Sequence, residues 1–308
     1  MAHWQHYYQP TSVGEALTHL QHHSGAARVI AGGTDLLLEI QQGHRPPVAA
    51  LVDVTRIPDL VTVARDGDWC YVGAGVTHTA IVASAELAQA ATCLVESCGV
   101  IGGPQVRNVA TLGGNVAHAL PAGDGTLSLV ALDAEAEIAQ APGAGQTPAR
   151  QWRPILDLYR GPGQSAVDAS RELIVRFRFR AAGPGEATAF KRVMRPQGVA
   201  LPILGLAAWV SVQAGVIAAA RIAVGPAGPT PMRARRAEAA LAGQAWTPEA
   251  LPALADLVVE EARLRTSPHR ATAEYRRELI LPLLSRALTL AVRRAVTATS
   301  APEAAEEA

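Results

Sequence analysis

The pattern of apolar and polar positions along the chain predicts three successive regions of different texture. The first alternates helix and strand. It opens with "SVGEALTHLQHH", an apolar-periodic stretch with Ser12 as a predicted N-cap and Glu15 three residues later, which is the spacing of a capping box. Two short apolar runs follow at 27–33 and 49–57. A helix among buried strands of this length predicts a small βαβ unit with a parallel sheet.

The second region begins near residue 60. Two alternating strands meet there at Asp66-Gly67-Asp68 and predict a hairpin in a second, mixed subdomain. Residues 80–99 have the apolar period of one or two amphipathic helices. A Gly/Pro-rich loop, a strand of period two and a domain junction are predicted further along, at 140–154, 171–179 and 181–188.

The third region contains an uncharged run, Leu201 to Ala220, that is long enough to span a membrane. It holds Pro, Gly, Ser and Gln residues, and its pattern favours two strands around a Gln-Ala-Gly turn. We therefore predict a hairpin over 203–224 and no membrane span. An alanine-rich helical pattern follows from 234 to 297, with breaks expected at Pro248, Pro252, Pro268 and Pro282.

Composition narrows the class of protein. Of 308 residues, 49% are hydrophobic and 18% charged, which is typical of a globular chain with room for two domains. Acidic and basic residues balance at 27 each and aromatics make up 4%, so neither charge nor stacking residues favour a nucleic-acid partner. The first residues lack the basic-then-apolar pattern of a secretory signal.

Cysteine usage excludes two kinds of site. Cys70, Cys93 and Cys98 are odd in number and form no CxxC pair, so one chain can build neither a disulfide scaffold nor a four-thiolate metal site. We expect buried free thiols in a reducing, cytoplasmic compartment.

Two glycine-rich loops carry the candidate chemistry. "VIAGGTDLL" at 29–37 is a strand that ends in Gly32-Gly33-Thr34, and "TLGGNVA" at 111–117 places Gly113-Gly114 between Thr111 and Asn115. Glycines allow successive amides to converge on an anion, although each pair alone is also compatible with an ordinary turn. Positive charge is scarce around both loops, so amides and hydroxyls are expected to bind a phosphate without an arginine clamp.

Other catalytic signatures are missing. "GAGVTH" has the first two glycines of GxGxxG but His78 in place of the third, and neither a P-loop nor an HExxH or GxSxG motif occurs. His118 and the pair His22-His23 are expected to be surface or packing residues. Asp35-Glu39 and Glu135-Glu137 are expected on solvated faces. Redox chemistry would therefore have to come from a bound cofactor.

Taken together and in order, the two loops resemble the signature motifs of the FAD-binding subunit of the molybdenum hydroxylases, the family of xanthine dehydrogenase and aerobic carbon monoxide dehydrogenase. The quoted stretches are "VIAGGTDLL" and "RNVATLGGNVAHALPAGD". The likeness continues through "RELIVRFRF", "AFKRVMR", "RIAVGPAGPTPMRA" and "ATAEYRRELILPLLSRAL", and thus covers nearly the whole chain.

The resemblance implies an α+β fold: a vanillyl-alcohol-oxidase (PCMH)-type FAD-binding domain of two α/β subdomains, followed by a smaller C-terminal α+β domain with an antiparallel sheet and helices. FAD would be bound non-covalently between the N-terminal subdomains. The implied division is a FAD-binding domain over 1–181 (subdomains about 1–57 and 58–181), a C-terminal domain over 186–297 and an acidic tail over 298–308.

The resemblance also implies roles for single residues. Thr34 and Thr111 would bond phosphate oxygens beside glycine amides, and Asp124 would accept hydrogen bonds from hydroxyls of the FAD. Ile174 matches an apolar position at the flavin and Lys191 a lysine near it, with a core residue and a surface lysine as open alternatives. The implied cofactor-binding residues are Val29, Ile30, Ala31, Gly32, Gly33, Thr34, Asp35, Leu36, Gly103, Thr111, Gly113, Gly114, Asn115, Asp124, Ile174 and Lys191.

The implied function is electron relay. The molybdenum cofactor would lie on a large partner subunit and [2Fe-2S] clusters on a small one, in a dimer of heterotrimers. FAD would pass electrons to NAD⁺, oxygen, a quinone or another carrier. Two alternatives stay open: a free-standing FAD oxidase of the same fold, and a flavin-binding scaffold without electron transfer. The substrate of the complex would be chosen by the large subunit.

Overall fold

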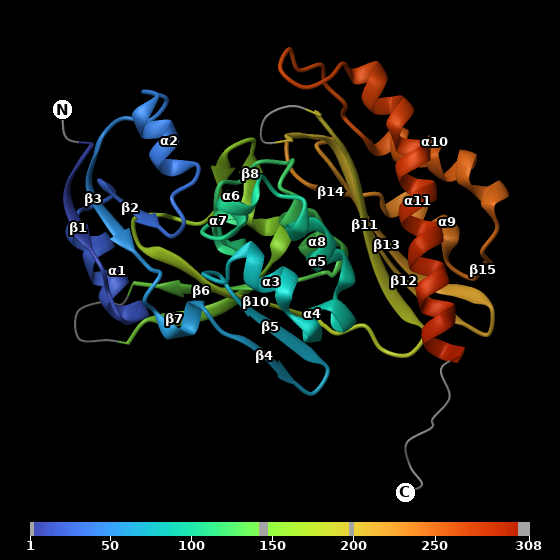
Figure 1. Ribbon diagram of the computed structural model, residues 1–308, viewed down its shortest axis with the longest axis horizontal. Coiled ribbons are helices and arrows are strands. Elements are labelled where there is room, and N and C mark those ends of the chain that lie inside the picture. Colours follow the sequence, from blue (N-terminus) through green and yellow to red (C-terminus); the bar gives the residue numbers. More distant parts are fainter. Residues whose placement is uncertain (1–2, 142–146, 197–199, 301–308) are drawn as a thin grey trace, which may run out of the picture.

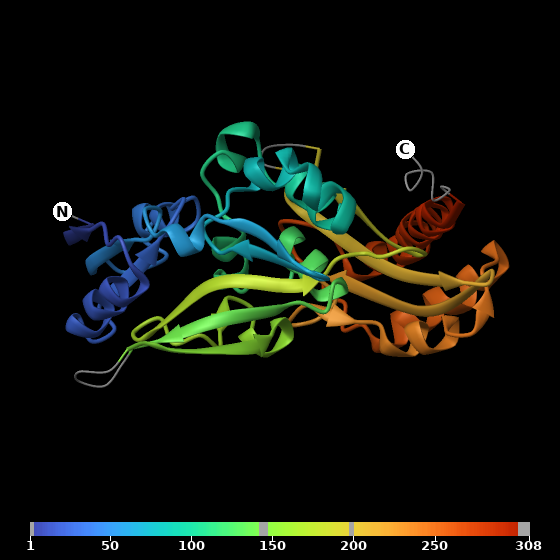
Figure 2. The ribbon, with the colours of Figure 1, turned by 90° about the horizontal axis from the view of Figure 1, so that it is seen from below.

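The computed structural model describes residues 3–141, 147–196 and 200–300, which form three units side by side along the longest axis of the molecule (Figure 1, Figure 2). Most of the predicted acidic tail lies outside the described residues, but its first three positions continue the last helix.

The N-terminal unit is a three-stranded parallel sheet in the order β1-β3-β2, which confirms the predicted parallel unit. The N-cap of its first helix is also confirmed, because Ser12 Oγ accepts from the Glu15 amide at 3.2 Å. The Glu15 carboxylate reaches back to the amide of Thr11 at 2.8 Å. The elements are β1 (Trp4–Tyr8), α1 (Val13–His22), β2 (Ala27–Ile30), α2 (Leu36–Gln41) and β3 (Val48–Asp53).

The middle unit contains a five-stranded antiparallel sheet in the order β4-β5-β10-β6-β7, and the predicted hairpin β4-β5 is confirmed. Its strands are β4 (Val63–Asp66), β5 (Trp69–Gly73), β6 (Glu135–Gln140), β7 (Ala149–Pro154) and β10 (Glu172–Arg180). A short ribbon, β8 (Tyr159–Gly161) and β9 (Gln164–Ser165), accompanies it, as do two 3₁₀ turns, η1 (Pro58–Leu60) and η2 (Ile155–Leu158).

Two expectations for this sheet are wrong. Residues 149–154 form a strand instead of a loop. They pair with β6, and the guanidinium of Arg178 lies over the Trp152 ring at 4.1 Å. A local count of Gly and Pro does not reveal these partners. Glu137 is buried and does not lie on a solvated face: its carboxylate pairs with Arg176 at 3.0 Å and Arg150 at 3.3 Å. Residues 142–146 of the predicted loop lie outside the described residues.

In the part of the middle unit that the structure describes, six short helices accompany the sheet. Where one or two helices were expected over 80–99, three form, because Thr77 and Ser84 each cap a new start; Ser84 Oγ accepts from the Leu87 amide at 3.2 Å. The helices are α3 (His78–Ala83), α4 (Ala85–Ala90), α5 (Thr92–Gly99), α6 (Pro104–Arg107), α7 (Leu112–Ala117) and α8 (Asp124–Ala131).

The C-terminal unit is an antiparallel sheet whose centre is the predicted hairpin, with its turn at Ala214-Gly215. Helix α11 lies along one face of this sheet (Figure 1). No helix in the described part of the chain is long and apolar enough to cross a membrane. The elements are β11 (Glu186–Met194), β12 (Pro202–Gln213), β13 (Val216–Gly225), β14 (Met232–Arg233), α9 (Arg235–Leu241), β15 (Gln244–Ala245), η3 (Pro248–Ala250), α10 (Leu251–Glu261) and α11 (Ala273–Ser300).

The expected break at Pro282 is wrong, because this proline lies inside α11. A proline in a helix interior costs about 3 kcal/mol. Burial of one large aliphatic side chain returns about 1.5–3 kcal/mol, and Leu283, Leu284 and Leu288 are all buried against the sheet. Packing therefore outweighs the local penalty.

The middle and C-terminal units are joined by polar contacts from α5. The Cys93 amide donates to Thr188 Oγ1 at 2.9 Å, and Glu96 accepts from the Phe190 amide at 2.7 Å and from Arg294 at 2.6 Å. The three cysteines are free and buried, as predicted.

Candidate functional site

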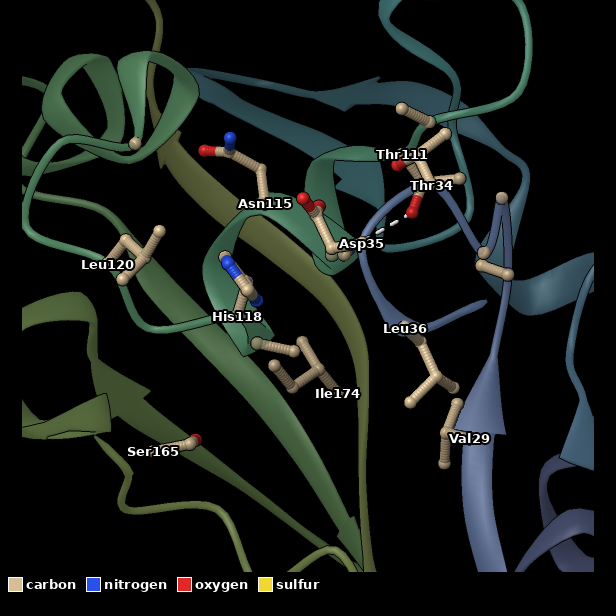
Figure 3. A pocket seen from close by; sticks show the side chains of 18 of the residues that line it. Val29, Thr34, Asp35, Leu36, Thr111, Asn115, His118, Leu120, Ser165 and Ile174 are labelled. Atoms are coloured by element: carbon tan, nitrogen blue, oxygen red, sulfur yellow. Dashed lines mark hydrogen bonds between the residues drawn. The ribbon is translucent and has the colours of Figure 1, made fainter. Parts of the chain in front are cut away.

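A pocket of about 850 Å³ lies where the three units meet. Its walls come from the β2–α2 loop, from α7 and the segment that follows it, from β10, and from the ends of β11 and β12. Figure 3 shows side chains of the β2–α2 loop and of α7 around the same space. This volume is within the range of sites that enclose a cofactor-sized molecule.

The β2–α2 loop presents unused amide donors. In the described part of the chain, the N–H groups of residues 32–36 donate no hydrogen bond. Gly33 has φ +67°, the left-handed conformation that turns successive amides toward one side. At Gly32 a Cβ would lie 2.1 Å from the carbonyl oxygen of Val109, so only glycine lets this loop sit against the neighbouring backbone.

The second glycine loop is built differently, because its amides are already bonded. The Gly113 amide donates to the Ala74 carbonyl at 2.8 Å, and the Gly114 amide to Thr111 Oγ1 at 3.0 Å. Asn115 Oδ1 accepts from the Thr126 amide at 3.1 Å. The loop therefore offers side chains to a ligand, chiefly the hydroxyl proton of Thr111, and Gly113 allows close packing on Ala74.

Asp124 begins α8 at the buried end of the pocket. Its Oδ2 is ion-paired with Arg192 NH1, and its Oδ1 is buried without any hydrogen-bond partner in the described chain. Burial raises the pKa of this carboxyl to about 6, against the opposing effect of Arg192 and Arg270. A buried acceptor without a hydrogen bond destabilises the protein until a donor binds to it.

Positive charge is not scarce at the site, which corrects the expectation from the local sequence. Arg28, Arg45, Arg192 and Arg270 all line the pocket. They come from four separate segments, and none belongs to a glycine loop. Only the folded chain brings them together.

Two histidines, His78 and His118, also line the pocket; for His118 we had expected a surface or packing position. His118 Nδ1 lies 3.8 Å from a Glu39 carboxylate oxygen on α2 (Figure 3 shows His118 beside Ile174). His78 is buried, and burial together with the charge of Arg107 lowers its pKa to about 4, so its imidazole is neutral at pH 7. No motif spacing marked either residue.

The pocket contains every residue predicted at the cofactor except Gly103 and Lys191. Gly103 is the N-cap of α6, and its neighbour Gly102 lines the wall instead. Lys191 lies on β11 next to Arg192, and successive side chains of a strand point to opposite faces. Because Arg192 faces the pocket, Lys191 does not.

The model of a protein family described as "FAD binding domain in molybdopterin dehydrogenase" matches residues 2–179, which is more than half of the chain. The chain belongs to this family. A second model, "CO dehydrogenase flavoprotein C-terminal domain", matches residues 188–291. The expected family and fold are thereby confirmed, and this molybdopterin dehydrogenase flavoprotein is part of an oxidoreductase.

Relatives match over nearly their full length. The flavoprotein is 29% identical over 274 residues to the xanthine dehydrogenase FAD-binding subunit of Escherichia coli, which covers 87% of this chain and 90% of that subunit. It is 30% identical over 292 residues to the carbon monoxide dehydrogenase medium chain of Afipia carboxidovorans, with 94% and 97% covered. The solved structure of carbon monoxide dehydrogenase from Hydrogenophaga pseudoflava gives a TM-score of 0.87 at 29% identity, covering 94% of this chain and 98% of that chain.

The residues of the flavoprotein fit a dinucleotide. The free amides of residues 32–36 suit a diphosphate, the unpartnered Oδ1 of Asp124 suits a sugar hydroxyl, and the mainly apolar walls suit aromatic rings.

Proposed function

We propose that this chain binds FAD non-covalently in the pocket and serves as the electron-transfer subunit of a molybdenum hydroxylase complex. FAD would take up electrons from iron–sulfur clusters on a partner subunit and release them to an external acceptor. One observation carries the proposal: the free amides of residues 32–36 share a pocket with Asp124, whose Oδ1 has no donor within the described chain.

The chain's own groups have separate tasks in this proposal. The amides of residues 32–36 hold the diphosphate, assisted by the hydroxyls of Thr34 and Thr111. Asp124 Oδ1 accepts from a hydroxyl of the cofactor, and Ile174 supplies an apolar contact to the ring system. Arg28 raises the electrostatic potential of the pocket toward an anion, whereas the charge of Arg45 is paired with Glu39 at 2.9 Å.

The complex is proposed from the relatives. Their names describe a FAD-binding subunit and a medium chain, which supports a subunit role over a free-standing oxidase or a redox-inactive scaffold. We propose a large molybdenum subunit and a small [2Fe-2S] subunit as partners, in a dimer of heterotrimers in the cytoplasm. We also propose the division into a FAD-binding domain, 1–181, and a C-terminal domain, 186–297.

The proposal is tested by purifying the chain from its host. We expect a flavin absorption spectrum, release of the flavin on denaturation, and co-purification of a large molybdenum chain and a small iron–sulfur chain. Flavin retained on the denatured polypeptide would contradict non-covalent binding. A lone monomer that oxidises a small substrate would favour the oxidase.

A further inference from the structure

The segment between α10 and α11 is an ordered loop rich in arginine. Its two arms run side by side: the Ser267 amide donates to the Ala271 carbonyl at 2.9 Å, and the Ala273 amide to Thr266 Oγ1 at 3.1 Å. The Arg270 amide closes the turn on the Ser267 carbonyl at 3.1 Å. This hairpin carries Arg265 on one arm and Arg270 at its tip, and Arg276 follows in the first turn of α11.

These three guanidiniums are crowded and have no carboxylate of their own. In the described part of the chain, Arg265, Arg270 and Arg276 form no ion pair, and the nearby Glu274 is exposed and forms none either. Burial and the charges of Arg270 and Arg265 lower the pKa of Arg276. Like charges held together without a counterion leave a strong local potential for an anion.

Arg276 is the fixed part of this cluster. Its side chain is 1% exposed, its NH1 donates to the Pro226 carbonyl at 3.3 Å, and its buried Nε has no partner in the described chain. A charge buried this deeply is costly unless something nearby compensates it. Arg265, by contrast, is exposed and Arg270 half-buried, so both can reach a ligand in solvent.

The cluster borders the FAD pocket. Arg270 lines the same pocket as Asp124 and Arg192, and Asp124 is the carboxylate whose charge acts on Arg270. That carboxylate is already paired with Arg192, so it leaves the cluster with excess positive charge.

We propose that Arg265 and Arg270, above the buried charge of Arg276, form an anion site at the rim of the FAD pocket that binds a phosphate group of the electron acceptor. The inference rests on the proposed function, because it assigns an acceptor class to the same pocket. It favours a phosphate-bearing acceptor over oxygen or an uncharged quinone.

The test uses inorganic pyrophosphate, titrated calorimetrically into the full chain loaded with FAD, so that the proposed diphosphate cradle of residues 32–36 is occupied. We expect the FAD-loaded wild type to bind pyrophosphate, and the FAD-loaded double variant Arg265→Gln/Arg270→Gln to bind it at least tenfold more weakly. Arg286→Gln is the matched control, because it removes one exposed arginine further along α11 and should leave binding unchanged. Equal binding by wild type and double variant overturns the site.

Two further measurements decide the source of the phosphate. FAD affinity should be the same in the wild type and in the single variant Arg265→Gln, because Arg270 lines the FAD pocket but Arg265 does not; a tenfold loss in Arg265→Gln would mean that the site holds a phosphate of FAD itself and would overturn the assignment to the acceptor. Reduced flavin in the complex gives up two electrons and two protons, and two ferricyanide anions take one electron each. In the double variant this reaction should slow at least tenfold more than reoxidation by a neutral benzoquinone does. Equal slowing with both oxidants also overturns the proposal.

A wild-type chain that binds no FAD would refute the proposed function. If that chain binds pyrophosphate and the double variant does not, the anion site still stands.

Discussion

We expect the ionised Asp124 to strengthen FAD binding and, in the FAD-free chain, to lower the free energy of unfolding. Its pKa rises from 3.8 to about 6, chiefly because burial penalises the charged form. The unfolded chain therefore ionises this group before the folded chain does, and stability is lost as the pH rises from about 4 to about 6. A shift of about two pKa units corresponds to about 3 kcal/mol, fully lost above about pH 6 and about half lost by pH 5.

The substitution Asp124→Asn removes this titration at nearly constant volume. We expect the cofactor-free variant to be more stable than the wild type at pH 7.5, by about 3 kcal/mol at most, and the difference to shrink by about half at pH 5. Breaking a buried ion pair, by contrast, commonly destabilises a protein by about 3–5 kcal/mol, which would make the variant less stable than the wild type. We expect the first of these effects to dominate, because burial raises the pKa of Asp124 and so makes its charged form less favourable in the folded chain than in the unfolded chain.

The assay is urea unfolding of the FAD-free chain, followed by tryptophan fluorescence, at both pH values. A variant less stable than the wild type at pH 7.5 would refute the reasoning, and so would parallel pH profiles. In the same samples, FAD should bind the variant about tenfold more weakly, because a neutral acceptor replaces a charge-assisted one. Wild-type affinity should also fall below about pH 6, where Asp124 takes up a proton.

Three other outcomes are expected. Gly32→Ala should lower FAD affinity and also lower the free energy of unfolding by about 1–3 kcal/mol, because its Cβ would lie 2.1 Å from a backbone oxygen. The control Gly14→Ala should be tolerated, because the nearest atom to its Cβ would be 3.8 Å away. Equal urea midpoints for the two variants would contradict this. Glu238→Gln should lower the free energy of unfolding by about 1–3 kcal/mol, because the buried Arg233 then keeps only the exposed Asp133, 3.1 Å away, as a charged partner; a loss below 1 kcal/mol in urea unfolding would contradict it. Burial raises the pKa of Cys93 to about 12, so native chain should not react with a thiol reagent at pH 8 until it unfolds.

The sequence predicted those features of the fold that depend on local pattern. The hairpin over 203–224, the parallel N-terminal unit and the Ser12 cap are confirmed because alternation, β-branched runs and capping residues act over a few neighbouring positions. The strand at 149–154 and the unbroken α11 were missed because their stability comes from partners distant in sequence. A local count of Gly and Pro contains no information about those partners.

The candidate site divides in the same way. The order and residue types of the two glycine loops, with Asp124, were enough to indicate a dinucleotide pocket and the family. The sequence did not determine which amides are free to bind a ligand. Only the folded structure shows that the amides of residues 32–36 donate no hydrogen bond, whereas those of Gly113 and Gly114 donate to oxygens of Ala74 and Thr111.

Charge at the pocket was decided by tertiary structure alone. Sequence alternation places Lys191 and Arg192 on opposite faces of one strand, but only the packing of β11 against its neighbours selects Arg192 for the pocket. Arg28 and Arg270 arrive from opposite ends of the chain. The sequence by itself therefore determined where the two glycine loops lie along the chain, because their turns are local. The electrostatic field over them depends on distances between remote residues, and those distances exist only in the folded protein.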